Sequence, residues 1–293
     1  MKFHSLLPSL LILFTFDCLS LDVQGHRGAR AVLPENSLPA FQYALEIGVD
    51  TIELDTVVSR DDEVIVFHDL QINPKICRYN DGSAVTKTLW VRQLALDEIK
   101  RFDCGSQVNA NFKQQKPIPG TQIPTLREVF ELVSGSELPN SETVRFNIEI
   151  KSGQQTPQAQ PKPSELANQI LKLVDEFGLH QRVIIQSFDH RTLIATHALN
   201  PKIELAALFR ENLDDWVTPT LAAKARVVSP RHTHLTKNEV ETIQAAGLRV
   251  IPWTANTQRA WKRLIQMGVD GIITDDPLPL MQLIGRTSPV KQP

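Results

Sequence analysis

The sequence predicts an α/β fold, a distorted (β/α)8 TIM barrel with a small inserted subdomain. Eight short runs rich in β-branched residues alternate with amphipathic segments over about 260 residues. Both the number of runs and the length are typical of such a barrel. Residues typical of helix starts and stops bound several of the amphipathic segments. A doubly wound open sheet is the second choice, because no glycine-rich dinucleotide fingerprint accompanies the pattern.

The strand candidates share a short apolar core, and polar residues follow several of them. They are Asp22–Gly25, Thr51–Asp55, Val144–Ile150, Val183–Gln186, Ile203–Phe209, Ala225–Ser229, Arg249–Pro252 and Gly271–Thr274. Helix candidates lie between most of them, at Ser37–Ile47, Ser164–Phe177, His190–Ala198, Lys237–Ala246 and Thr257–Met267. Ser37 and Thr236 are expected N-caps, and glycines such as Gly48 follow helix ends.

Residues 63–67 do not fit the alternation, because only four residues separate them from the preceding strand. A link that short cannot form a parallel crossover and predicts a hairpin. If the turn centres between Asp61 and Asp62, His68 lies opposite Asp55. A slip of one residue would turn the side chain of His68 away.

The chain divides into a barrel at residues 21–284 and an insertion at about residues 70–124. The insertion shows no strand–helix rhythm apart from a helical patch near Val91–Arg101, and it is rich in Asn, Lys, Gln and Pro. We expect it on a barrel loop, where specificity elements usually sit. Residues 153–163 read as a surface loop, and residues 285–293 as a disordered tail.

Residues 1–20 have the layout of a signal peptide. Lys2 precedes an apolar run, Leu6–Phe16, which is too short to span a bilayer as a helix. Cys18-Leu19-Ser20 offers small residues for cleavage after Ser20. We therefore expect an exported protein, periplasmic or secreted, with no stable membrane insertion after cleavage. An uncleaved anchor or a buried hydrophobic arm is the alternative.

Cleavage would leave two cysteines, Cys77 and Cys104. An even pair in an exported chain permits a disulfide, worth about 3 kcal/mol by loop entropy. Two unrelated thiols are the alternative.

Composition limits the function classes. The 293 residues are 42% hydrophobic, ample for a buried core, and 31 Lys+Arg against 33 Asp+Glu give a formal charge of −2. Nucleic-acid binders usually show a basic surplus or a basic block, so no nucleic-acid partner is expected. The oligomeric state stays open.

Three carboxylates stand at the ends of predicted strands, where barrel enzymes place their active sites. Glu53 and Asp55 are two residues apart and should share one face, as should Glu149 and Lys151. Converging carboxylates repel unless a cation compensates, and an all-oxygen set suits one hard divalent ion, Mg²⁺ or Ca²⁺. The alternative is that each of the three carboxylates forms its own ion pair.

Two histidines complete a set of groups suited to phosphodiester chemistry. His26 and His68 could serve as general base and acid on opposite sides of one site. Arg27 offers a fork of donors for phosphate, and Lys151 an ammonium. A metal and these cations would neutralise the non-bridging oxygens during displacement at phosphorus.

The order of these motifs resembles the glycerophosphodiester phosphodiesterase family over about residues 23–283. The resemblance rests on a series of motifs: Gly25–Gly28, Pro34–Phe41, Gly48–Asp55, Val64–Asp69, Phe146–Lys151, Gln186–Phe188, Pro252–Asn256 and Gly268–Pro277. Two departures are small: Ser37 stands where Thr is usual, and Ala255 where Val is common.

The resemblance implies metal ligands at Glu53, Asp55 and Glu149. It also implies acid–base catalysis by His26 and His68, and phosphate contacts from Arg27 and Lys151. Phe188 and Trp253 are implied as apolar walls of the substrate pocket, although each could instead be an ordinary residue of the hydrophobic core. The implied path has the glycerol 2-hydroxyl attack phosphorus to give a cyclic phosphate, which water then opens.

The expected activity is metal-dependent hydrolysis of glycerophosphodiesters, such as glycerophosphocholine and glycerophosphoethanolamine, to sn-glycerol 3-phosphate and an alcohol. One alternative keeps the fold and acts on lysolipids as a lysophospholipase D, or on a teichoic-acid or inositol-type ester. The insertion shows no long apolar stripe for an acyl chain, which favours water-soluble diesters. The alternative of another class is a non-catalytic phosphate-ester binding module.

Overall fold

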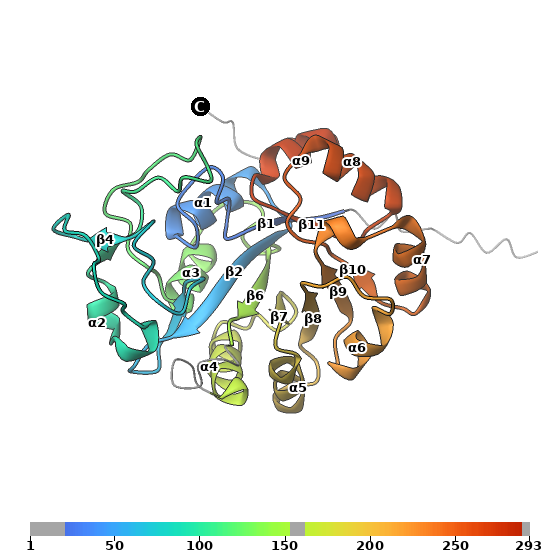
Figure 1. Cartoon of the computed structure of the whole chain (residues 1–293), viewed down its shortest axis with the longest axis horizontal. Coiled ribbons are helices and arrows are strands. Elements are labelled where there is room, and N and C mark those ends of the chain that lie inside the picture. Colours follow the sequence, from blue (N-terminus) through green and yellow to red (C-terminus); the bar gives the residue numbers. More distant parts are fainter. Residues whose placement is uncertain (1–20, 153–161, 289–293) are drawn as a thin grey trace, which may run out of the picture.

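Eight parallel strands form a ring at the centre of the molecule, and helices pack around the outside (Figure 1). The computed structural model describes residues 21–152 and 162–288. The ring strands are β1 (Asp22–Gly25), β2 (Thr51–Val58), β6 (Arg145–Ile150), β7 (Val183–Ser187), β8 (Glu204–Phe209), β9 (Val227–Pro230), β10 (Arg249–Val250) and β11 (Gly271–Thr274). The expected signal peptide at residues 1–20 lies outside the described residues, as does most of the expected loop at residues 153–163.

The order of the strands nearly closes the ring. The path runs β10-β9-β8-β7-β6-β2-β1-β11. Two backbone hydrogen bonds join its ends, from Asp270 N to Val250 O at 2.9 Å and from Ile273 N to Pro252 O at 3.1 Å. The predicted (β/α)8 barrel is confirmed, and the open sheet is excluded.

One helix follows each ring strand around the barrel. These helices are α1 (Leu38–Ile47), α3 (Leu126–Ser134), α4 (Pro163–Glu176), α5 (His190–Leu199), α6 (Val217–Ala222), α7 (Lys237–Ala245), α8 (Gln258–Met267) and α9 (Pro277–Leu283). The expected cap of α1 is present: the Ser37 hydroxyl accepts from Ala40 N, and Gly48 ends the helix in a left-handed conformation. Helix α3 is not among the helices that the sequence predicts, although Thr125 and Glu128 form its capping box.

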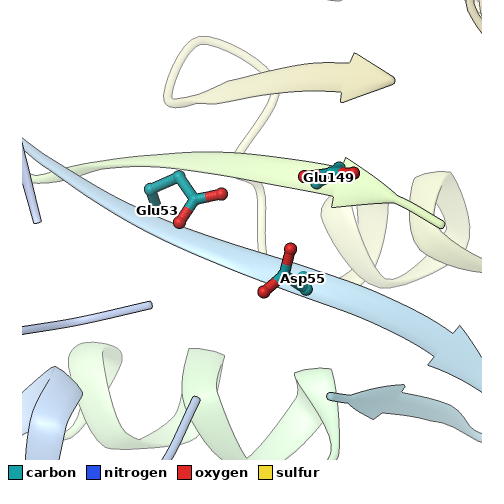
Figure 2. A group of neighbouring side chains, drawn as sticks. All are labelled: Glu53, Asp55 and Glu149. Carbon is teal, nitrogen blue, oxygen red and sulfur yellow. The ribbon is translucent and has the colours of Figure 1, made fainter. Parts of the chain in front are cut away.

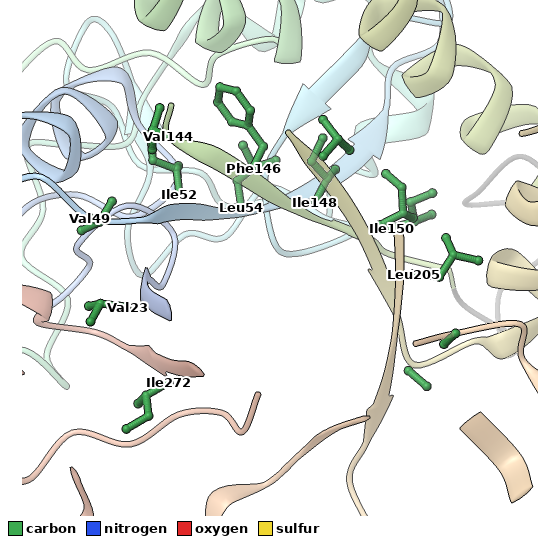
Figure 3. Packing of buried hydrophobic residues seen from close by; sticks show 14 of the residues in the cluster. Val23, Val49, Ile52, Leu54, Val144, Phe146, Ile148, Ile150, Leu205 and Ile272 are labelled. Atoms are coloured by element: carbon green, nitrogen blue, oxygen red, sulfur yellow. The ribbon is translucent and has the colours of Figure 1, made fainter. Parts of the chain in front are cut away.

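Alternate residues of the strands face two different environments. Ile52 and Leu54 of β2, with Phe146 and Ile148 of β6, point out toward the helices and form the main core (Figure 3). The intervening residues point into the barrel. At one level the interior is apolar, where Ile184 clusters with residues from three other strands and with Ile251, which follows β10. Elsewhere it is polar, and this polar interior holds the candidate site.

The strand β3 (Val64–Val66) pairs antiparallel with β2, as the hairpin prediction requires. The predicted register was wrong by one residue, because Phe67 rather than His68 faces Asp55, with Phe67 N donating to Asp55 O at 3.0 Å. The turn closes between Ser59 and Glu63, with Asp62 in a left-handed conformation at φ 65°. His68 lies beyond the end of β3, so the register slip does not remove its side chain from the site.

The insertion has a small core of its own. It contains β4 (Arg78–Tyr79), a 3-10 turn (Val91–Gln93), α2 (Leu96–Ile99) and β5 (Phe102–Asp103), all at one side of the barrel (Figure 1). Ile72, Ile99 and Phe102 are buried there against Val57 and Ile65 of the hairpin. Cys77 and Cys104 form a disulfide within this cluster.

The predicted start of the disordered tail, at residue 285, is too early in the chain. Arg286 donates to Asp50 at 2.5 Å and to Gly48 O at 3.0 Å, which fixes the chain against the end of α1. A guanidinium and a carboxylate 236 residues apart in the sequence supply no local signal. Residues 289–293 lie outside the described residues.

No helix within residues 21–152 and 162–288 combines the length and the apolar character that a membrane span requires.

We predict that Cys77→Ser together with Cys104→Ser destabilises the insertion by about 3 kcal/mol, because the disulfide restricts the unfolded chain between two residues 27 apart. Guanidinium unfolding followed by circular dichroism, with reduced wild-type protein as the control, measures the loss. An unchanged unfolding midpoint in both would contradict this.

Candidate active site

Three buried carboxylates lie together, Glu53 and Asp55 along the middle of β2 and Glu149 near the carboxyl end of β6 (Figure 2). Glu53 and Asp55 alternate with outward residues of β2, and strand pairing puts Glu149 of β6 beside Asp55. One oxygen from each carboxylate lies within 4.8 Å of the others. Their side chains belong to residues only 1%, 0% and 6% exposed, respectively. The sequence prediction that these three converge therefore agrees with the geometry.

Polar neighbours hold each carboxylate in place. Glu53 accepts from the backbone N of Arg27 and from the Gln186 side chain, both at 2.8 Å. Asp55 accepts from the Asn36 side chain at 2.7 Å and lies 3.1 Å from Arg27 Nε.

Lys151 joins two of the carboxylates. Its Nζ lies 2.9 Å from Asp55 Oδ1 and 2.6 Å from Glu149 Oε1. Lys151 follows β6 and therefore reaches the same cluster as Glu149, as the spacing of the two residues predicts.

The electrostatics of the cluster fit a divalent cation. Burial, together with the neighbouring carboxylates Asp55 and Glu149, raises the pKa of Glu53 well above its usual value. Burial also raises the pKa of Glu149, against the opposing effect of Lys151. The donor set is entirely oxygen, which suits Mg²⁺ or Ca²⁺. A cation at this point would offset both the burial of these charges and their mutual repulsion.

His26 stands at the end of β1 beside the acidic cluster. Its Nδ1 lies 2.5 Å from Asp275 Oδ1, and its Nε2 lies 3.9 Å from Glu53 Oε2. Burial, and then the charge of Arg30, lower the pKa of His26 to about 4. The imidazole is therefore neutral at neutral pH, with Asp275 fixing its orientation.

His68 lies on the other side of the pocket, just after the hairpin. Its Nδ1 lies 2.6 Å from Asp69 Oδ1, and Asp69 also accepts from Asn73 at 2.7 Å. Both candidate acid–base histidines are thus oriented by a carboxylate, which leaves Nε2 of each for other contacts.

Arg27 occupies a tight loop between β1 and α1. Its backbone adopts φ 51°, and Gly28 follows at φ 85°. The guanidinium of Arg27 contacts Glu35 at 2.5 Å as well as Asp55. Burial works against its charge, but Asp55 and Glu35 hold the pKa of Arg27 above its usual value.

Aromatic side chains form one wall of a pocket of about 530 Å³. Phe188 and Trp253 meet edge to face, with ring centroids 5.4 Å apart. The same pocket is lined by His26, Arg27, Glu53, His68, Glu149 and Lys151. Asp55 is fully buried and does not itself line the pocket. The structure therefore brings together every predicted catalytic, metal-ligating and substrate-contacting residue.

Several site residues received no role from sequence reasoning. Asp275 orients His26, Gln186 and Asn36 orient the metal-ligating carboxylates, and Arg210 lines the pocket. Asp275, Gln186 and Asn36 stand inside the recognised motifs, and that position is the only signal the sequence offers for them. Arg210 lies in none.

A barrel whose pocket is lined by part of this acidic cluster, two oriented imidazoles, an arginine and a lysine has the groups that a phosphodiester-cleaving enzyme requires. Residues 26–278 match the glycerophosphoryl diester phosphodiesterase family. The chain belongs to this family, as the motif series indicated.

Individual comparisons agree. The chain is 32% identical over 262 residues to the glycerophosphodiester phosphodiesterase of Caldanaerobacter subterraneus, covering 89% of this chain and 97% of that one. A solved structure from Silicibacter pomeroyi, provisionally named for the same family, gives a TM-score of 0.84 at 25% identity over 91% of this chain and 95% of its own. An Oleispira antarctica phosphodiesterase, solved in complex with the product sn-glycerol-3-phosphate, shares the fold, with a TM-score of 0.73 at 22% identity and 91% and 97% coverage.

Gly28→Ala should abolish activity and lower stability. A Cβ at this position would meet the backbone and side chain of Ala40 at 2.8 Å, and the left-handed φ of 85° adds strain. The loop would have to move, and Arg27 with it. Turnover and thermal unfolding measure the effect. Gly82→Ala, at φ 87° with nothing within 4 Å, is the matched control for backbone strain alone. Equal losses in the two variants would contradict the proposed steric cause.

Metal binding should weaken as pH falls and should release protons. Because the pKa values of Glu53 and Glu149 are raised, protons compete with a cation for these carboxylates more strongly than they do at ordinary carboxylates. Calorimetric titration of Ca²⁺ or Mg²⁺ in two buffers of different ionisation enthalpy, at pH 5 and pH 8, measures both effects. Glu149→Gln should bind less tightly and release fewer protons. Equal affinity at the two pH values would contradict this expectation.

Proposed function

We propose that this enzyme hydrolyses glycerophosphodiesters such as glycerophosphocholine and glycerophosphoethanolamine to sn-glycerol 3-phosphate and an alcohol. The observation that supports it is the placement of His26 and His68 on one pocket, around the acidic cluster that both face. Family membership supports the reaction class, and the lining of the pocket supports the choice of residues.

The phosphate would sit where cationic groups and the acidic cluster meet. A divalent ion, Ca²⁺ or Mg²⁺, held by Glu53, Asp55 and Glu149, would neutralise charge on a non-bridging phosphate oxygen. Lys151 and Arg27 line the same pocket and are already held by carboxylates, so neither needs to be ordered when the substrate binds.

Two proton transfers accompany the displacement. One imidazole accepts the proton of the glycerol 2-hydroxyl as that oxygen bonds to phosphorus. The other donates a proton to the alcohol oxygen as its bond to phosphorus breaks. In the second step, water attacks phosphorus and the bond from phosphorus to the glycerol 2-oxygen breaks. The roles of the two imidazoles are exchanged: one takes a proton from the water and the other donates a proton to the 2-oxygen. Asp275 and Asp69 hold the rings in position through both steps.

Polar lining favours water-soluble alcohols over lysolipids. Beyond Phe188, the cavity next to the pocket is lined by Asp69, Ser152, Asp189 and Arg210. An acyl chain there would desolvate charged groups without replacing their hydrogen bonds.

We also propose that the enzyme works outside the cytoplasm, in the periplasm or the medium. The charge and hydrophobicity pattern of residues 1–20 supports export. The Cys77–Cys104 disulfide is a bond that oxidising compartments maintain.

The test is release of sn-glycerol 3-phosphate from glycerophosphocholine by metal-stripped protein, with and without Ca²⁺ or Mg²⁺. Release should require metal. His26→Ala and His68→Ala should each lower it about 10²–10⁴-fold, the range for lost acid–base catalysis. His180→Ala is the matched control, because His180 pairs with Asp175 on helix α4 and does not line the pocket.

No release from folded, metal-loaded protein would contradict the proposal. Turnover of lysophosphatidylcholine in its place would then indicate a lysophospholipase D. Calorimetric binding of glycerophosphocholine without product would indicate a phosphate-ester binding module.

A further inference from the structure

The pocket around the acidic cluster opens into a second compartment. The two share His68, Glu149, Lys151, Phe188 and Arg210 as lining residues. The second compartment adds Asp69, Leu70, Ile150, Ser152, Ser187 and Asp189. It continues through Asp69 and Leu70 into a surface groove on the insertion, which reaches Asn73, Lys75 and Trp90.

The acidic side chains of this second compartment are already engaged. Asp69 accepts from His68 and Asn73. Asp189 accepts from Arg191 through two hydrogen bonds, at 2.9 and 2.7 Å, and from Ser152 at 2.7 Å. Glu149 contacts Lys151 and belongs to the candidate metal cluster.

Arg210 is different, because its charge is not balanced. The guanidinium packs over the Phe188 ring at 4.0 Å, and within residues 21–152 and 162–288 no hydrogen bond or ion pair reaches its side chain. Lys75 in the groove is likewise without a carboxylate partner among the described residues. The route from the pocket to the groove therefore carries two free positive charges.

The stacking leaves Arg210 ready to bind an anion. A guanidinium that lies on an aromatic face keeps its N–H donors in its own plane, at its edges. Those edges suit the oxygens of a phosphate, which guanidinium binds in a bidentate manner. Because Phe188 already restricts the side chain, less entropy is lost when an anion binds.

The two compartments differ in the ligand that they suit. The first has an apolar part lined by Phe188, Trp253, Leu208 and Ile273, which suits the carbon chain of the glycerol that all substrates of the proposed reaction share. The second is continuous with an open groove and so has room for an alcohol of variable size.

We infer that the second compartment binds the leaving alcohol and that Arg210 recognises a further phosphate on it. The preferred substrates are then glycerophosphodiesters whose alcohol is itself a phosphate ester. This inference rests on the proposed glycerophosphodiesterase activity and specifies its substrate class. Arg210 is the specificity-determining residue, and Lys75 lies further along the same route.

Two substrates that differ only in the added phosphate ester test the inference. In glycerophosphoglycerol the leaving alcohol is neutral glycerol. In bis(glycerophospho)glycerol the leaving alcohol is glycerophosphoglycerol, which carries a negative charge. The metal-loaded enzyme should show the higher kcat/KM for bis(glycerophospho)glycerol, calculated per cleavable end, and high salt should reduce the preference.

Arg210→Gln should lower kcat/KM for bis(glycerophospho)glycerol about tenfold, the scale of a lost charge-assisted hydrogen bond, and change that for glycerophosphoglycerol much less. Arg210→Lys should restore part of the preference. Arg231→Gln is the matched control, because Arg231 stacks 5.5 Å from the Trp253 ring centroid but lines neither compartment.

A purely structural role for Arg210 predicts equal losses with both substrates, and that result would overturn the inference. Equal kcat/KM for the two substrates in the wild-type enzyme would also overturn it, while leaving the proposed function intact. Absence of glycerol phosphate from both substrates and from glycerophosphocholine would instead contradict the proposed function.

Discussion

Repulsion among three buried carboxylates is the constraint on which the rest of this structure depends. Glu53, Asp55 and Glu149 occupy inward positions that a packed barrel would otherwise fill with apolar side chains. Burial of a charge costs free energy unless hydrogen bonds and opposite charges compensate. Arg27, Lys151, Gln186 and Asn36 supply part of that compensation, and a divalent cation would supply the remainder.

Strand pairing converts this constraint into a site. The parallel register of β2 and β6 places Asp55 beside Glu149, and the polar level of the barrel interior surrounds them. The same β2 continues beyond the barrel into the hairpin that returns His68. The outward residues of these strands form the main hydrophobic core with the helices, so the strands that carry the ligands are held by the largest packed region (Figure 3).

Much of the site could be predicted because it follows from local periodicity. The spacing of two residues between Glu53 and Asp55, and between Glu149 and Lys151, requires only that each segment is a strand. The hairpin register could not be fixed in this way, because it depends on Asp62 adopting a left-handed conformation at the turn. One such residue shifts every opposing pair by one position.

Other contacts could not be predicted because the two partners lie far apart in the sequence. Asp275 orients His26 across 249 residues, and Arg286 holds the end of the chain against Asp50 across 236. Neither pairing has a sequence spacing that suggests it. The barrel closure that unites β1 with β11 creates the first of these contacts. The small core of the insertion could not be predicted for a related reason, since part of it comes from the hairpin.

The architecture separates the constant and variable parts of the chemistry. Residues on barrel strands and the short loops after them line the pocket beside the acidic cluster, whereas Leu70 and the groove beyond it belong to the insertion. Under the proposed function, changes in the insertion would alter the alcohol that is accepted without disturbing the carboxylates. Barrel enzymes commonly place the reacting groups on rigid strands and the specificity contacts on adaptable loops.

The most direct test of this account is a crystal structure of the protein soaked with Mn²⁺, with anomalous scattering used to locate the ion. Mn²⁺ prefers the same oxygen ligands as Mg²⁺ and Ca²⁺. The account predicts one strong peak within bonding distance of Glu53, Asp55 and Glu149, with Lys151 withdrawn from at least one carboxylate. A structure in which no ion binds there and the Lys151 contacts persist would contradict the claim that a cation compensates the three buried charges.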